Sequence, residues 1–163
     1  MAFDAYLKVD GIPGECTDDK HKDWVELLSF NYGMDQPVHS QTSAMGAMSA
    51  VRVNVHPVRV TKLIDFSSPK LYVACCSGQH IPNVVIEVCR AGGDKQKYLE
   101  IKMNDALVSS VNTGGAARGE DIPTEEVGFN FAKINWTYIK LTKEGKPAGN
   151  VAGGWDLAAN KKF

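Results

Sequence analysis

Residues 126–141 read EVGFNFAKINWTYIKL, and the spacing of their large apolar side chains is typical of β-strands. Val127, Phe129 and Phe131 alternate with small or polar residues, so they share one face of an extended chain. The alternation changes phase after Phe131 and resumes at even-numbered positions from Ile134. The pattern predicts two consecutive strands, each with an apolar and a more polar face.

The same period of two extends toward both ends of the chain. Residues 3–9 alternate cleanly, and residues 24–32 form a second candidate strand. Residues 68–78 are the exception, because a serine-proline start and a closing Gly78 predict one short helix. About eight or nine strands and one helix predict a mainly β protein, either a closed barrel or a sandwich.

The composition is that of a globular protein with almost no net charge. Hydrophobic residues make up 44% of the 163 residues, and 18 basic side chains against 19 acidic ones give a net charge of −1. A near-neutral chain without basic stripes that contain aromatic residues is not expected to bind nucleic acid. The uncharged residues 36–51 are too polar to span a bilayer, so no membrane insertion is expected.

The first ten residues lack the apolar block of a Sec-type signal peptide. Four cysteines occur, and a chain of this size without such a signal does not need disulfides. The cysteines are therefore expected to be reduced thiols, and the protein is expected to fold in the cytosol.

No stretch of the sequence indicates catalysis or a cofactor. Residues 92–95 (GGDK) lack the lysine and hydroxyl pattern of a phosphate loop and are better explained as a hairpin turn. The cluster Asp18, Asp19, His21 and Asp23 has neither the glycine nor the closing glutamate of a calcium loop. We interpret residues 17–23 as a solvated charged loop, and we expect no metal.

Residues 33–50 form an unusually long segment between strands, with little periodicity and the single charge of Asp35. Three methionines lie in it, Met34, Met45 and Met48. Loops of this length inside compact domains tend to be functional or disordered. Apolar, flexible methionines are costly to expose and adapt well to a partner, so the segment is expected to project and contact a neighbouring molecule.

Seven short motifs in order resemble the Hcp (haemolysin-coregulated protein) family of bacterial type VI secretion systems. Together they cover nearly the whole chain: AYLKVDGIPGE (5–15), ID with SPKL (64–71), CSGQHI (76–81), RAGGD (90–94), LVSSV (107–111), PTEEV (123–127) and GWDL (154–157).

The resemblance implies a two-sheet antiparallel β-barrel of the Hcp or phage tail-tube type, with one short α-helix around residues 68–78. It implies a structural subunit that forms hexameric rings stacked into the inner tube of a contractile injector, with neither catalysis nor cofactor. The implied partners are further copies of the chain, the VgrG spike, the contractile sheath and effectors carried in the pore. The implied location is the cytoplasm during assembly, and then the extracellular space or a target cell.

Residues 1–163 are accordingly expected to be a single tube domain with a long loop at 33–50. Since the chain ends six residues after Leu157, no fused toxin domain is expected.

The resemblance also assigns surfaces to particular residues. Ser29 and Asn31 are expected to face the pore, where small polar groups can hold and release cargo. Ring-stacking or inter-subunit contacts are expected at Met34, Met45, Met48, Gly92, Gly93 and Trp155. In the family, the position of Asn31 is often serine, so this asparagine leaves the identity of the cargo open.

Two other functions remain open at this stage. A phage tail-tube protein would have the same architecture in a different machine. A small-ligand binder would use the interior of the barrel as a pocket. The large apolar residues available to fill a small barrel argue against the second alternative.

Overall fold

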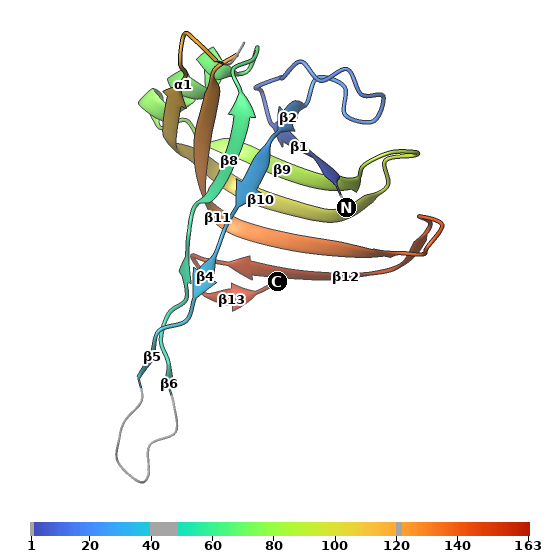
Figure 1. Ribbon diagram of the computed structural model, residues 1–163. Helices are drawn as coiled ribbons and strands as arrows, with labels where there is room; N and C mark the ends of the chain where they lie inside the picture. Colours follow the sequence, from blue (N-terminus) through green and yellow to red (C-terminus); the bar gives the residue numbers. More distant parts are fainter. Residues whose placement is uncertain (1, 40–48, 120–121) are drawn as a thin grey trace.

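The structure is a computed structural model that describes residues 2–39, 49–119 and 122–163 (Figure 1). Strands dominate it, and one helix occurs in the described part of the chain. The elements in order are β1 (Phe3–Val9), β2 (Val25–Leu27), β3 (Ser29–Asn31), β4 (Met34–Asp35), β5 (Val38–His39), β6 (Ser49–Ala50), β7 (Asn54–Val55), β8 (Val58–Leu63), α1 (Ser68–Ser77), β9 (Ile81–Arg90), β10 (Lys97–Gly114), β11 (Thr124–Leu141), β12 (Pro147–Asp156) and β13 (Lys161–Lys162).

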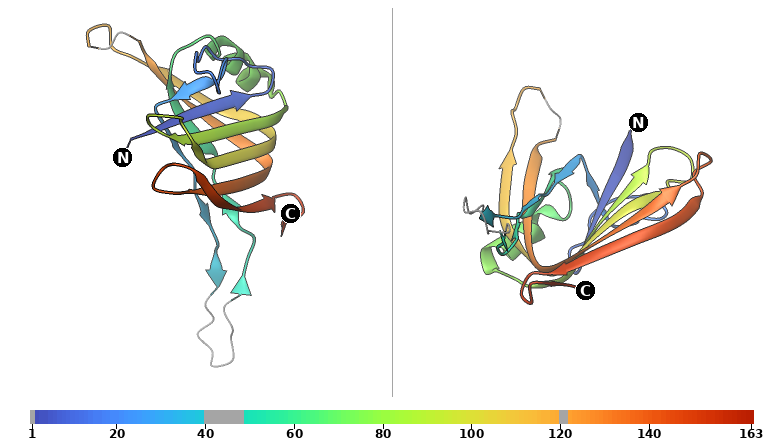
Figure 2. Two further views of the ribbon diagram at one scale, coloured as in Figure 1. Left: turned by 90° about the vertical axis from the view of Figure 1, so that its right-hand side faces the viewer. Right: turned by 90° about the horizontal axis from the view of Figure 1, so that it is seen from below.

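Nine of the strands form one antiparallel sheet in the order β13-β12-β11-β10-β9-β1-β2, with β8 joined to β11 and β3 joined to β8. Within the described residues this order does not close on itself, so the expected closed two-sheet barrel is not found. Strands β10 and β11 have 18 residues each and run through both halves of the bent sheet (Figure 2). The two halves are therefore parts of one continuous sheet, joined by strands that bend without a break.

The sequence predicted two shorter strands where β11 lies, and this was wrong because the change of phase does not end the strand. The ladder with β10 continues on both sides of it, through the pairs Asn104–Lys133 and Ala106–Phe131. Between them, Asp105 has a φ of +49°. Aspartate tolerates this left-handed conformation better than most residues. Asp105 lies on β10, so β10 can change the side on which its apolar residues lie while the ladder with β11 stays paired.

Residues 24–32 were predicted as one strand, but the structure divides them at Leu28. Strand β2 pairs with β1, whereas β3 pairs with β8. The Leu28 amide donates to the carbonyl of Thr61 at 2.8 Å, which joins the turn to β8. The chain therefore passes from one part of the sheet to another at this residue.

One face of the sheet is buried and forms the core, which helix α1 covers at one end (Figure 1). Fully buried side chains come from β1, β8, β9, β10 and β11. They include Leu7 (β1), Val60 (β8), Ile86 (β9), Ile101 and Met103 (β10), and Phe129 and Ile134 (β11).

Helix α1 agrees closely with its prediction. Pro69 lies in the first turn, and Gly78 ends the helix with a φ of +63° and an amide bonded to the Ala74 carbonyl. Ser67 occupies the N-cap position, but its side chain makes no capping hydrogen bond. Its hydroxyl donates to Asp65 instead, at 2.5 Å.

Residues 33–39 and 49–56 project from the body as a two-stranded arm (Figures 1 and 2). Strand β4 pairs with β7, and β5 pairs with β6 farther out. Met45 and Met48 lie outside the described residues. None of the helical structure in the described ranges has the length and apolar character needed to cross a membrane. All four cysteines are free.

Candidate assembly surfaces

A broad polar surface lies on the sheet face opposite the core, across β3, β8, β11 and β10. Ser29 pairs with Thr61, which pairs with Glu126. Directly paired residues of antiparallel strands point to the same side, so the three side chains form one row. The next positions point to the other side, where Val60 and Val127 are fully buried.

Asn31 belongs to a parallel row of the same polar surface. It pairs with Arg59, whose partner on β11 is Gly128, and Gly128 in turn pairs with Ser110. Both Ser29 and Asn31 are exposed. The structure thus places the two predicted pore residues together on one solvated, mostly uncharged surface.

The base of the arm is held by a small polar cluster. His56 Nε2 lies 2.7 Å from Asp35 Oδ1, and the Asn54 side chain donates to Asp35 Oδ2 at 3.0 Å. The His56 amide donates to the Gly33 carbonyl at 2.9 Å. The hydrogen bond from His56, followed by that from Asn54, lowers the pKa of Asp35.

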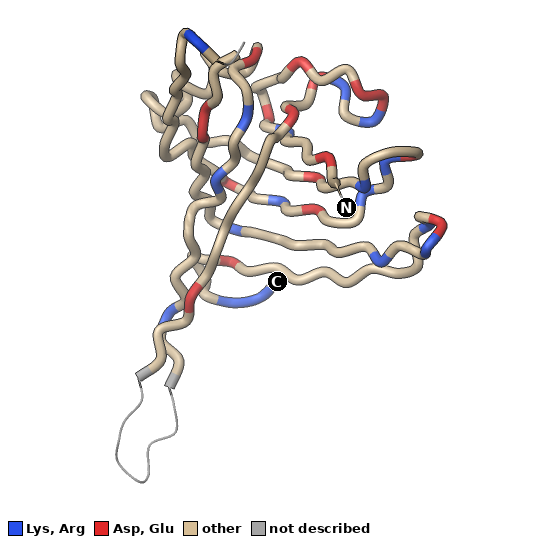
Figure 3. Tube along the Cα trace, in the orientation of Figure 1, with Lys and Arg blue, Asp and Glu red and all other residues tan. Residues whose placement is uncertain are grey.

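Beyond this base, the arm exposes apolar side chains. Met34, Val38 and Val51 are 46%, 51% and 46% exposed. Asp35 and Arg52 are the only Asp, Glu, Lys or Arg residues in its described part, residues 33–39 and 49–56, whereas both charge signs are scattered over the body (Figure 3). An isolated two-stranded ribbon is marginally stable at best, so a further surface packed against this arm would stabilise it.

The other predicted contact residues lie apart from the arm. Gly92 and Gly93 occupy the turn between β9 and β10, with φ values of +88° and +60° that favour glycine. A Cβ at either position would meet no atom within 4 Å, so the turn is open on its outer side. Trp155 lies on β12, is partly buried and packs against the core. The structure therefore distributes the predicted contact residues over three regions and does not form one site from them.

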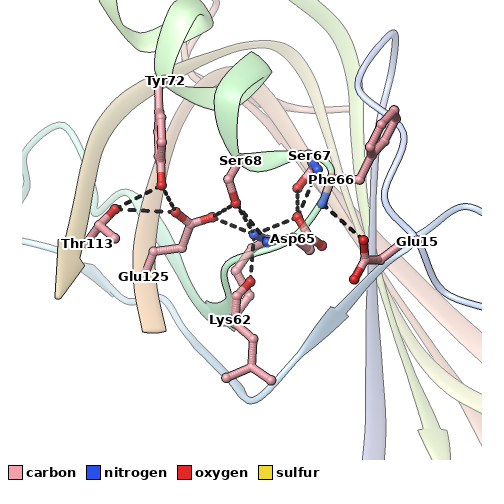
Figure 4. Close-up of polar contacts among 10 residues, drawn as sticks. Glu15, Lys62, Asp65, Phe66, Ser67, Ser68, Tyr72, Thr113 and Glu125 are labelled. Carbon is pink, nitrogen blue, oxygen red and sulfur yellow. Dashed lines mark hydrogen bonds and ion pairs between the residues drawn. The ribbon is translucent and has the colours of Figure 1, made fainter. Parts of the chain in front are cut away.

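A buried ionic network, which the sequence did not predict, connects α1 to the sheet (Figure 4). Lys62 on β8 is fully buried and contacts Glu125 on β11, with 2.5 Å between Nζ and Oε1. Its ammonium group also lies 2.9 Å from Asp65 Oδ1 and donates to the Ser68 hydroxyl at 3.1 Å. The first turn of the helix thus contacts the lysine of β8, which is itself paired with the glutamate of β11.

Glu125 accepts several hydrogen bonds in this network. The hydroxyls of Ser68 and Tyr72 donate to its two oxygens, each at 2.6 Å, and Thr113 donates to it at 3.3 Å. Burial by itself would raise the pKa of Glu125, but the hydrogen bonds from Lys62, Ser68 and Tyr72 together lower it. The carboxylate is therefore held in its charged form inside the protein.

The charged loop at residues 17–23 is less solvated than expected, because His21 is only 2% exposed. Its ring stacks on Tyr6, with centroids 4.0 Å apart and planes 8° apart, and meets the edge of Trp24. Nδ1 lies 2.9 Å from Asp18 Oδ1, and Nε2 lies 2.8 Å from Glu87 Oε2. Throughout the described ranges, three or more His, Cys, Asp or Glu side chains are nowhere grouped to hold a metal ion.

Some residues of the Lys62–Glu125 network and of the His21 cluster lie in the sequence motifs described above, and others do not. Asp65, Ser68 and Glu125 belong to the ID, SPKL and PTEEV motifs, but nothing in the sequence indicated that they meet. Tyr6 lies in the first motif, whereas His21 was considered only as a doubtful metal ligand. A lone histidine in a charged stretch gives no signal of burial, because its partner Glu87 is 66 positions away.

Comparison with known proteins shows close relatives. Residues 6–138 match the family model described as "Type VI secretion system effector, Hcp". Protein hcp1 of Pseudomonas aeruginosa is 39% identical over 162 residues, covering 98% of each chain. The "Major exported protein" of the same organism is 28% identical and covers 85% of this chain and 90% of its own.

Solved structures agree in fold as well as in sequence. A structure described as a type six secretion system protein superimposes with a TM-score of 0.93 at 36% identity, covering 99% of this chain and 100% of its own. Hcp1 from Salmonella typhimurium superimposes with a TM-score of 0.79 at 32% identity, covering both chains completely.

Proposed function

The chain belongs to the Hcp family of type VI secretion proteins, and from this membership we propose that it is a structural subunit of the inner tube. Copies of the chain form hexameric rings, and the rings stack. Contraction of the sheath expels the tube, and effectors travel in its pore. The role is mechanical and uses neither a cofactor nor a catalytic residue.

The observation that carries this proposal is the projecting arm. It leaves Met34, Val38 and Val51 about half exposed on two short ladders, and Arg52 of the arm donates a hydrogen bond to the Leu157 carbonyl of the body. Apolar side chains in such a position favour a partner that buries them. A neighbouring copy in the same or the next ring would supply that partner repeatedly, as a tube requires.

The polar surface around Ser29 and Asn31 fits the lining of a pore. Its rows across β3 and β8 combine hydroxyls and an amide with Arg59 and Glu126, which have opposite charges. A mixed surface of this kind offers many weak hydrogen bonds and no large apolar patch, which suits transient contact with cargo. Ser29 and Asn31 are accordingly assigned to the pore.

Gly92, Gly93 and Trp155 are assigned to contacts between subunits. The open outer side of the glycine turn allows another backbone to approach closely. The partners beyond the tube are the VgrG spike, the sheath and the effectors. The subunit assembles in the cytoplasm and is then exported, in keeping with the relative named "Major exported protein".

Measuring the size of the purified protein tests the proposal. Multi-angle light scattering should give the mass of six chains at tens of micromolar, and negative-stain electron microscopy should show rings with an open centre. A monomer mass together with compact particles would contradict it.

A tube protein of a phage tail is the second candidate, because such a protein would need the same arm and polar surface. Co-sedimentation with VgrG and with a type VI sheath separates the two functions. A small-ligand pocket inside the sheet is not favoured, since Ile86, Ile101, Met103 and Phe129 fill the inner side and are fully buried.

A further inference from the structure

The buried histidine of residues 17–23 has carboxylates on both sides. Each ring nitrogen of His21 lies within hydrogen-bond distance of a carboxylate oxygen, one on Asp18 and one on Glu87. An ionised carboxylate only accepts hydrogen bonds, and a neutral imidazole has a single N–H to donate. With one proton, the ring would donate to one carboxylate and direct the lone pair of its second nitrogen at the other carboxylate. The arrangement is therefore complete only when His21 carries a proton on both nitrogens.

The same cluster reaches the turn between β9 and β10. Asp18 also pairs with Lys95 at 2.9 Å, and Lys95 donates to the Tyr6 hydroxyl at 3.0 Å. Lys20, next to His21, donates to the Asp94 carbonyl at 2.5 Å. The turn that carries Gly92 and Gly93 is thus fastened to residues 17–23 through Asp18 and Lys20, both close to His21 in the sequence.

The turn needs such fastening because its backbone is unusual. Gly92 and Gly93 have positive φ values, and Lys95 has a φ of +43°, which a lysine rarely adopts. A strained conformation persists only where the surrounding contacts hold it. The nearest partners of the Lys95 ammonium are Asp18 and Tyr6, the same two side chains that contact the His21 ring, and Asp4 lies farther away at 3.8 Å.

We propose that His21 is a positioning residue for self-assembly: with both nitrogens protonated it holds residues 17–23 and the turn 91–95 as one surface for contact with a second copy of the chain, and loss of a proton releases the turn. The proposal rests on the stacking function proposed above. It adds that the stacking contact depends on pH through one buried side chain.

The groups that face His21 keep their charge state around neutral pH. Hydrogen bonds from Lys95 and His21 lower the pKa of Asp18, and those from Lys97 and His21 outweigh desolvation and lower the pKa of Glu87. Both carboxylates thus remain ionised well below neutral pH.

The remaining titratable neighbours change only in alkaline solution. Hydrogen bonds to Tyr6 and Asp18 raise the pKa of Lys95, and burial raises that of Tyr6. Burial also raises the pKa of Cys16, and that of Cys89 to about 11. Among side-chain types, an imidazole is the one that ordinarily gains or loses a proton closest to neutral pH.

The unmodified protein provides the first test. Nitrogen-15 NMR of the His21 ring reports how many protons it carries, and hydrogen exchange reports local opening. We follow two amides, that of Asp23, bonded to the Cys16 carbonyl, and that of Arg90, bonded to the Gln96 carbonyl beside the turn. As the ring loses a proton, both protection factors should fall about tenfold or more, as expected when a charge-assisted hydrogen bond is lost.

A variant and a matched control link this opening to assembly. His21→Gln keeps a side-chain donor but cannot carry the charge, whereas His80→Gln changes an exposed histidine paired with Asp105 at 2.7 Å. Ring stacking, measured by sedimentation between pH 6 and pH 8.5, should weaken about tenfold with rising pH in the parent and the His80 variant. In His21→Gln it should be weak throughout and nearly independent of pH.

Constant protection factors while the His21 ring changes its protonation would overturn the proposal, and so would a ring with a single proton at pH 6. Unchanged stacking with intact pH dependence in His21→Gln would also contradict it. If the parent forms no stacked rings at any pH, the tube function itself fails, whereas the NMR and exchange results still decide whether His21 positions the turn.

Discussion

The ammonium group of Lys62 lies 2.5 Å from a carboxylate oxygen of Glu125, and both side chains are closed to solvent. Because β8 and β11 carry these residues and α1 supplies Ser68 and Tyr72, the pair joins three elements at one point. Two buried charges cost much free energy unless every partner is present. The end of the sheet under the helix should therefore be sensitive to any change in this network.

Replacing one member of the pair should destabilise the protein strongly. Glu125→Gln leaves Lys62 with Asp65 as its remaining carboxylate, and we expect the free energy of unfolding to fall by about 3 kcal/mol. Chemical denaturation measures the change. Lys62→Met combined with Glu125→Leu removes both charges. The double variant should lose clearly less stability than the sum of the losses measured for Lys62→Met alone and Glu125→Leu alone. Additive losses would mean that the pair is not coupled.

Acid should weaken the same network. The folded protein holds the pKa of Glu125 below that of an unfolded glutamate, so its contribution is complete above about pH 4.3 and is lost as pH falls through the lower folded value. Unfolding curves from pH 7 to pH 2 should therefore show a steeper loss of stability in the parent than in Glu125→Gln. Parallel curves would exclude this carboxylate as a source of the acid sensitivity.

A methyl group at Gly14 should not fit. A Cβ there would lie 2.7 Å from the Trp24 carbonyl carbon and 2.8 Å from Val25 Cγ2, and backbone atoms cannot move aside easily. We expect Gly14→Ala to cost about 1–3 kcal/mol of stability, as overpacked sites do. Gly153→Ala is the matched control, since a Cβ at Gly153 meets no atom within 4 Å. Equal thermal stability of the two variants would contradict the packing described here.

The arm should matter for assembly more than for folding. Replacing residues 36–53 by a short Gly-Ser turn keeps the cluster of Asp35, Asn54 and His56 at the base. The variant should keep its circular dichroism spectrum and its ring mass, but ring stacking and secretion should be lost. Val38→Asp with Val51→Asp, which keeps the length of the arm, should act in the same direction. Secretion at the level of the parent would show that the arm does not form the stacking contact.

Asn31→Gln tests the pore assignment, because it keeps the amide and lengthens the side chain. Rings should assemble normally, and co-purification of a pore-carried effector should fall severalfold. Asn150→Gln, also at an exposed position but on β12, is the matched control and should leave effector binding unchanged. Normal effector binding together with a lower melting temperature would make Asn31 a structural residue.

Local features of the fold could be predicted from the sequence because they depend on neighbouring residues. The period of two identified β1, and Pro69 and Gly78 marked α1. The change of phase after Phe131 was misinterpreted as the end of a strand, since the positive φ of Asp105 on the partner strand β10 leaves no clear pattern in the sequence.

The clusters that hold the fold together could not be predicted, because their members are distant in the sequence. Lys62 and Glu125 are 63 positions apart, and His21 and Glu87 are 66 apart. Single charged residues normally indicate a solvated surface, and only the folded chain reveals that Lys62, Glu125 and His21 are buried and that Glu87 is largely covered. The resemblance to the Hcp family indicated the motifs but not their contacts.

A cryo-electron microscopy reconstruction of the purified protein tests the central claim most directly, because it resolves both the assembly and the direction of its side chains. We predict stacked rings of six subunits around an open centre, with Ser29 and Asn31 on the inner wall and the arm of each subunit against a neighbouring copy. Compact particles without a central opening, or rings with Ser29 and Asn31 on the outer wall, would contradict the assignment of this chain as a tube subunit.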